Sequence, residues 1–181
     1  MKILHFSDIH YWKIQIGSDP YYPKRFLGLM NLVFSRKNHF PPPLADTVIN
    51  AIRQEEADAV LFSGDLTTTS LESEFKKAAD SFAPLYEKWG DQLIVIPGNH
   101  DRYTPSSVKA KFYEEYFPDA FAGMGSRVFS KPLNDHLCVI GFDASRPFMV
   151  RSNGTFTESL TKELDNELSK IRKNYQNVIL M

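Results

Sequence analysis

Cysteine is almost absent from this sequence, with Cys138 as the single occurrence among 181 residues. One cysteine cannot form an internal disulfide, and it cannot supply the several thiolates of a metal–sulfur cluster. Cys138 lies within the apolar run Leu137–Ile140. We therefore expect a buried thiol without redox or metal chemistry.

A large net charge and a long hydrophobic run are also missing. The chain has 21 Lys and Arg against 22 Asp and Glu, so its composition does not favour a nucleic-acid partner. No stretch approaches the ~18–20 apolar residues of a membrane-spanning helix. The amino terminus, Met1–Asp8, becomes polar too early for a signal peptide. These absences predict a cytoplasmic protein, and the length predicts a single domain over residues 1–181.

Short apolar runs alternate with helical patterns along the chain. Five runs predict buried strands: Ile3–Phe6, Ala59–Ser63, Leu93–Pro97, Leu137–Phe142 and Val178–Met181. Apolar stripes predict three helices, through Leu44, Val48 and Ile52, through Phe75, Ala78, Ala79, Phe82 and Leu85, and through Leu160, Leu164, Leu168 and Ile171. Thr155–Glu158 is a capping-box pattern, and Val128–Phe129 is expected to pair with the fourth strand as a hairpin. This alternation predicts an α/β layered fold with a largely parallel sheet in its first half.

Polar motifs follow the first three predicted strands. Asp8-Ile9-His10 comes after the first strand, Gly64-Asp65 after the second and Gly98-Asn99-His100-Asp101 after the third. The carboxyl ends of parallel strands share one edge of the sheet, where open α/β folds bind ligands. Each motif alone also suits an ordinary turn. Three of them in this order, each after an apolar strand, predict a metal site.

The residue types suit hydrolysis of a phosphate ester, which needs charge neutralisation and a strong nucleophile. Two divalent metals roughly 3.5–4 Å apart supply both, by clamping phosphate oxygens and lowering the pKa of a bridging water. We assign Asp65 as the carboxylate shared between the ions, because the preceding glycine allows a tight turn. Asp8 and His10 are expected to project to the same side of extended backbone and chelate one metal. Asn99 offers an amide oxygen to the second metal.

Two residues of the third motif have predicted catalytic roles. His100 is left free to contact the phosphate or to protonate the leaving oxygen. Asp101 is expected to orient the imidazole of His100 and to raise its pKa.

The order Asp-x-His, Gly-Asp, Gly-Asn-His-Asp resembles the calcineurin-like metallophosphoesterases, over nearly the whole chain. The resemblance implies a four-layer αββα sandwich. It places Asp8, His10 and Asp65 on one metal, with Asp65 and Asn99 on the other. It also implies that His100 lies near the substrate phosphate and that the metals are two divalent ions such as manganese, iron or zinc.

The sequence departs from the family pattern in one respect. The family supplies further histidines from two later segments, one just after a strand and one in a Gly-His-x-His motif. His5, His39 and His136 do not occupy such positions. We therefore expect a longer natural protein with a histidine shortly after Met181, an incomplete second sheet in the 181 residues, and at most one firmly bound metal in that piece.

An insert over residues 18–43 carries five of the eleven prolines and encloses the almost wholly apolar Phe26–Phe34. One interpretation is a helical cap that packs on the domain. The other is peripheral contact with an anionic membrane surface. The residues that would make this contact are Phe26, Leu29 and Phe34, flanked by Lys24, Arg25, Arg36 and Lys37.

Local sequence also resembles particular branches of the family. Arg25–Arg36 followed by Pro41–Pro43, with Gly64–Thr67 and Asn99–Pro105, looks most like bacterial cyclic-nucleotide phosphodiesterases and is similar to UDP-diacylglucosamine hydrolases. The likeness implies a phosphodiester or pyrophosphate substrate, either a cyclic nucleotide or a nucleotide-linked lipid. The alternatives are an inactive scaffold, a phosphomonoesterase and a nuclease. The retained metal-site residues argue against the scaffold, and the near-neutral charge argues against the nuclease.

Overall fold

Two three-stranded sheets organise the described part of the protein. The computed structural model describes residues 1–13, 42–117, 126–147 and 154–181. The first sheet holds three parallel strands in the order β1 (Ile3–Phe6), β2 (Ala59–Phe62) and β3 (Leu93–Val95). The second holds β4 (Val128–Asn134), β5 (Leu137–Phe142) and β6 (Asn177–Leu180), with β5 antiparallel to β4 and parallel to β6. The predicted parallel sheet and the β4–β5 hairpin are confirmed.

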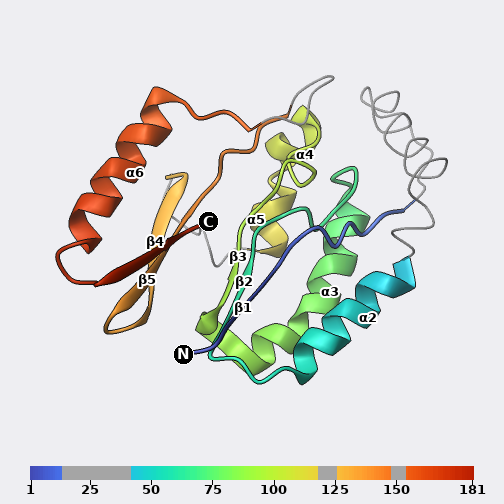
Figure 1. Ribbon diagram of the computed structural model, residues 1–181. Helices are drawn as coiled ribbons and strands as arrows, with labels where there is room; N and C mark the ends of the chain where they lie inside the picture. Colours follow the sequence, from blue (N-terminus) through green and yellow to red (C-terminus); the bar gives the residue numbers. More distant parts are fainter. Residues whose placement is uncertain (14–41, 118–125, 148–153) are drawn as a thin grey trace.

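Helices cover the outer face of each sheet. They are α2 (Pro42–Gln54), α3 (Glu72–Trp89), α4 (Pro105–Ala110), α5 (Phe112–Tyr116) and α6 (Glu158–Ile171), with a 3₁₀ turn η2 at Gly90–Gln92. Figure 1 shows α2 and α3 on one side of the first sheet and α6 on the far side of the second. The order helix, sheet, sheet, helix agrees with the αββα sandwich.

Strand β2 shows how three apolar cores separate these four layers. Its side chains alternate, because successive residues of a strand point to opposite faces. Val60 and Phe62 enter the core under α2 and α3, whereas Ala59 and Leu61 enter the core between the two sheets. A third core, which includes Ile140, lies between the second sheet and α6. The prediction of strands covered on both faces is therefore confirmed for β2.

The edge strands are less covered than predicted. His5 in β1 is exposed, and so are Asn177 and Leu180 at the ends of β6. In the described sheets each of these strands has one strand neighbour. An apolar run therefore predicted the presence of these strands but overstated their burial.

The predicted helical faces are confirmed for α3 and α6, and in α2 for Ile52, which is buried, and Val48, which packs against the core, but not for Leu44. Leu44 is 45% exposed, whereas Ala45, Ile49 and Ile52 are buried. The buried stripe thus runs through steps of four and three, not through successive steps of four. Thr155–Glu158 does not form a capping box: Thr157 is the N-cap of α6, and its hydroxyl accepts the N–H of Leu160.

The apolar segment Phe26–Phe34 and its basic flanks lie outside the described residues. Pro42 and Pro43 begin α2. Among the helices that the structure describes, none has the length and apolar character needed to cross a bilayer.

Glu74 joins the segment after β1 to the loop after β2. Its carboxylate is fully buried and accepts the N–H groups of Lys13 (3.2 Å), Thr69 (2.9 Å) and Leu71 (3.1 Å). The Thr69 hydroxyl donates a fourth hydrogen bond (3.0 Å). Burial raises the pKa of Glu74 to about 7, although these hydrogen bonds act to lower it. The residue is therefore a buried link between two of the loops that carry the polar motifs.

Glu74→Gln should lower the free energy of unfolding by about 1–3 kcal/mol at pH 5. Each side-chain oxygen of Glu74 accepts a backbone N–H, and in glutamine an NH₂ group, which cannot accept, takes the place of one oxygen. The raised pKa means that the folded protein keeps a proton that the unfolded chain releases above pH 4.5. The contribution of Glu74 to the free energy of unfolding is therefore complete below pH 4.5 and is lost as the pH rises toward about 7. Urea unfolding at several pH values should show the difference from wild type shrinking over this interval.

Glu87→Gln, at an exposed position of the same helix, is the control and should change the free energy of unfolding little. A Glu74→Gln difference that grows with pH would contradict the assignment.

Candidate metal centre

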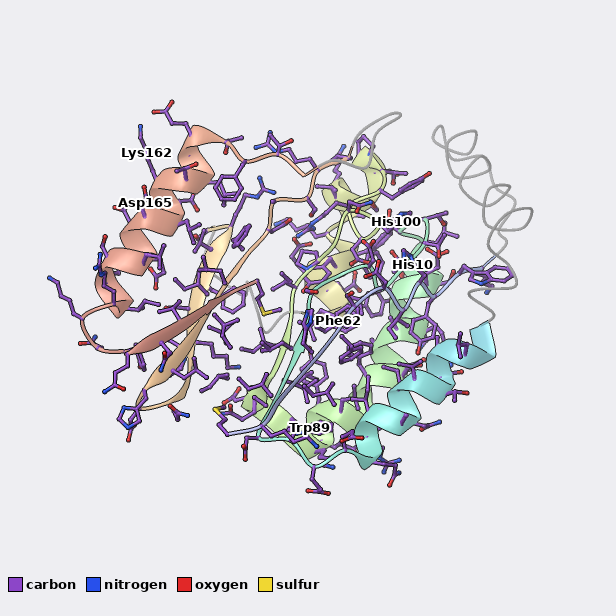
Figure 2. All side chains as sticks on the ribbon, in the orientation of Figure 1. His10, Phe62, Trp89, His100, Lys162 and Asp165 are labelled. Carbon is purple, nitrogen blue, oxygen red and sulfur yellow. The ribbon has the colours of Figure 1, made fainter. Side chains whose placement is uncertain are left out.

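The three polar motifs lie together at the carboxyl edge of the first sheet. The main chain after β1 donates hydrogen bonds to the main chain after β2, from Asp8 N–H to the Gly64 oxygen and from His10 N–H to the Asp65 oxygen, both at 3.0 Å. Figure 2 shows His10 and His100 beside each other at this end of the sheet, with Trp89 at the opposite end. The predicted convergence of the motifs is confirmed.

The backbone that carries the predicted ligands is not extended. Asp8, His10 and Asp65 have φ values of 61°, 52° and 63°, in the left-handed region that few non-glycine residues adopt. The prediction that Asp8 and His10 share a side through extended backbone is therefore wrong. Their side chains still meet, with His10 Nε2 3.5 Å from Asp8 Oδ1.

Two glycines allow the second and third loops to touch. Gly64 has a φ of 103°, which confirms the expected tight turn before Asp65. A Cβ added at Gly64 would overlap the main chain of Gly98, and one added at Gly98 would overlap Asp65. The close approach of the two loops therefore excludes a side chain at both positions, and at Gly64 it adds to the requirement for a positive φ.

Asp101 is the residue that ties these loops together. Its buried carboxylate accepts the N–H groups of Gly98 (2.9 Å), Asp65 (2.9 Å), Leu66 (3.2 Å) and Thr67 (2.9 Å). The Thr67 hydroxyl adds a fifth hydrogen bond at 3.0 Å. Burial, followed by the charge of Asp65, raises the pKa of Asp101 to about 6, although the hydrogen bonds from the main chain act to lower it. The carboxylate thus holds the loop of Asp65 against the loop of Gly98.

His100 is oriented by a main-chain carbonyl. Its Nδ1 lies 2.7 Å from the Thr68 oxygen, and since a carbonyl only accepts, Nδ1 carries a proton. The backbone N–H of His100 donates to Asp65 Oδ1 at 2.9 Å. The prediction that Asp101 orients this imidazole is therefore wrong, because the carboxylate of Asp101 is bound to the loop main chain and Thr67.

The surroundings of His10 suit the binding of a cation. Its Nδ1 donates to the Thr67 oxygen at 3.3 Å, and Nε2 lies 3.5 Å from Asp8 Oδ1 and 3.8 Å from Asp65 Oδ2. Burial, followed by the nearby charge of His100, lowers the pKa of His10 and favours the neutral ring. In that form the Nε2 lone pair faces two carboxylates. A cation bound between the lone pair and the carboxylates would be attracted by both.

Burial also raises the pKa of Asp65, because a desolvated carboxylate is costly without a positive partner. A divalent ion would remove the penalty at Asp65 and bind the lone pair of His10. Imidazole nitrogen and carboxylate oxygen together suit manganese, iron or zinc. The residues present therefore fit the metal chemistry expected from the sequence.

The compact group comprises His10, Asp65 and His100, with one ligand atom from each within 4.8 Å of the others. Asp8 is beside it with a 57% exposed side chain, and Asn99 is half-buried next to His100. His100, assigned a non-ligand role from sequence, is thus near enough to bind a metal. The ligand roles of Asp8, His10, Asp65 and Asn99 stay predictions.

Sequence reasoning missed the groups that hold the two imidazoles. These are the carbonyls of Thr67 and Thr68, which any residue type could supply, so no residue pattern marks them. It also missed Arg102, a buried cation paired with Glu114 at 2.6 Å and with Asp143 at 3.1 Å. Its position directly after the third motif was the available signal.

Comparison with known proteins agrees with this geometry. The model of a family described as calcineurin-like phosphoesterase matches residues 1–181. The match includes all three motifs and both sheets. Among curated proteins, none matches the chain.

Asp101→Asn should lower the free energy of unfolding by about 1–3 kcal/mol, because both carboxylate oxygens accept backbone N–H groups and the amide leaves at least one without an acceptor. The variant should also bind Mn²⁺ more weakly, although Asp101 is not a predicted ligand. Urea unfolding and a Mn²⁺ titration measure the two effects. Asp165→Asn, on the exposed face of α6 (Figure 2), is the control. Unchanged stability together with unchanged Mn²⁺ affinity would contradict the linking role.

Proposed function

Because the chain belongs to the calcineurin-like phosphoesterase family, we propose that it hydrolyses a phosphodiester or pyrophosphate at a centre of two divalent metal ions. Members of the family are metal-dependent phosphoester hydrolases, and this chain is an enzyme of that class. The observation that carries the proposal is the buried His10, whose Nε2 faces the carboxylates of Asp8 and Asp65.

In the proposed centre, Asp8, His10 and Asp65 hold one ion, while Asp65 and Asn99 hold the second. The ions would supply neutralisation of phosphate charge and a lowered pKa for water. The Thr67 carbonyl fixes the tautomer of His10 and leaves Nε2 as the donor atom. The two oxygens of Asp65 have different partners: Oδ1 accepts the backbone N–H of His100, and Oδ2 faces His10.

The proposed role of His100 is to contact the phosphate and to deliver a proton to the leaving oxygen. Its Nδ1 proton is bound to the Thr68 oxygen at 2.7 Å. Nε2 is therefore the nitrogen left to hold the transferable proton. The half-buried position of His100 at the carboxyl edge of the sheet supports access by a substrate.

For the substrate we propose a cyclic nucleotide or a nucleotide-linked lipid. The support is the likeness of Gly64–Thr67 and Asn99–Pro105 to bacterial enzymes that act on such compounds. Contact with a membrane through Phe26, Leu29 and Phe34, and a cytoplasmic location, stay predictions.

Asp65→Ala should abolish hydrolysis and lower the occupancy of both ions, because it removes the proposed shared carboxylate. Asp8→Ala should mainly remove one ion. The full-length natural protein is assayed with Mn²⁺ against bis-p-nitrophenyl phosphate, p-nitrophenyl phosphate, cyclic nucleotides and nucleotide-linked lipids, and metal content is measured by elemental analysis.

Asp165→Ala is the matched control and should retain both metal and activity, since this carboxylate is exposed on α6. Full dinuclear occupancy in Asp65→Ala would refute the shared ligand. A wild-type protein that binds metal but hydrolyses none of these substrates would refute the proposed substrate classes.

His100→Ala should retain metal and lose activity by roughly 10²–10⁴-fold, the usual contribution of a general acid or base. The expectation separates two roles that the geometry brings close together, since a ring nitrogen of His100 is within 4.8 Å of ligand atoms of His10 and Asp65. Metal analysis alongside the assay decides between them. Loss of metal from His100→Ala would make His100 a ligand.

A further inference from the structure

Tyr103 covers one face of the His100 imidazole. The two ring centroids are 5.5 Å apart and the planes differ by 12°, so the rings are stacked. His10 meets the same imidazole at right angles, with centroids 4.9 Å apart. His100 is therefore bounded by two rings in different directions, in addition to its hydrogen bond to Thr68.

The main chain on both sides of Tyr103 is anchored. Arg102 is buried and forms ion pairs with Glu114 at 2.6 Å and Asp143 at 3.1 Å. Thr104 is also buried and is the N-cap of α4, where its hydroxyl accepts the Ser107 N–H at 3.3 Å. Tyr103 thus presents its ring from a segment whose neighbours on either side are held by buried polar contacts.

A single hydrogen bond does not determine the plane of an imidazole. The ring of His100 is able to tilt about its Nδ1–H···O contact while that contact persists, and the tilt moves Nε2. A flat aromatic face against the ring removes this freedom, because stacked rings prefer near-parallel planes.

We propose that Tyr103 is a positioning residue that sets the plane of the His100 imidazole and hence the direction of Nε2. The expected effect of Tyr103 on kcat rests on the proposed function. The orientation of the His100 ring by Tyr103 does not. The stacking needs a flat ring, not the phenol hydroxyl. Phenylalanine at position 103 should therefore preserve the stacking on His100, whereas leucine, which is apolar but not flat, should not.

The kinetic test compares Tyr103→Phe and Tyr103→Leu in the hydrolysis of bis-p-nitrophenyl phosphate. Tyr103→Leu should lower kcat about tenfold with KM changed by less than about twofold, because only the orientation of His100 is lost. Tyr103→Phe should stay within about twofold of wild type. Metal content should be unchanged in both. Tyr116→Leu, which removes a partly exposed aromatic from α5, is the control for general loss of packing.

A double-mutant cycle tests whether Tyr103 acts through His100. In the His100→Ala background, Tyr103→Leu should have almost no further effect on kcat, because the group that it orients is gone. An equal loss in both backgrounds would overturn the proposal, and so would a rise in KM at constant kcat, which would indicate direct substrate contact. A large loss in Tyr103→Phe would place the effect at the hydroxyl and would also overturn it.

A readout without turnover separates this proposal from the proposed function. NMR of ring-labelled histidine, with the His100 signals assigned by their loss in His100→Ala, reports the ring current of the stacked tyrosine. The His100 ring protons should shift in Tyr103→Leu and stay near wild type in Tyr103→Phe. No shift in Tyr103→Leu would overturn the positioning role even if hydrolysis is observed. The expected shift in an inactive protein would establish the stacking in solution and refute the proposed function.

Discussion

The geometry of the site depends on one buried anion, the carboxylate of Asp101. It collects backbone N–H groups from its own loop at Gly98 and from the neighbouring loop at Asp65, Leu66 and Thr67. A buried carboxylate is costly unless it is hydrogen-bonded, so the two loops are held at the spacing that satisfies it. The loop after β2 then bonds to the loop after β1. All three motifs are therefore held in register by contacts that begin at a residue outside the predicted ligand set.

The packing of the cores explains why β1, β2 and β3 end side by side, so that the three loops begin next to one another. Side chains of β2 alternate between the helix-covered core and the core between the sheets. A slip of one residue would exchange these faces, placing Phe62 in the wrong core, so the hydrophobic pattern fixes the register. The resulting pairing aligns Phe6 with Phe62 and Phe62 with Val95. The residues that follow these positions carry the motifs, and packing in the interior thus determines the position of the site at the edge.

Much of this arrangement was predictable from the sequence, for reasons that also mark the limits. Strand runs and the polar residues after them are local signals, and the parallel sheet brings them together. The role of Asp101 was not predictable, because the sequence His100-Asp101 is compatible both with a carboxylate that contacts the imidazole and with one that accepts backbone N–H groups. The left-handed conformations of Asp8 and His10 depend on the loop after β2, about 55 residues away, whose main chain accepts their N–H groups. The carbonyls that orient His10 and His100 belong to the main chain and leave no mark in residue identity.

The left-handed backbone at Asp8, His10 and Asp65 has a consequence for how this sequence can change. Each such residue costs on the order of 1 kcal/mol relative to ordinary backbone, and glycine would adopt the conformation without that cost. Selection for stability alone would therefore favour glycine at the positions where a metal site needs a side chain. The backbone conformation of the three residues works against the stability of the fold, and their presence in this conformation is better explained by selection for chemistry than for folding.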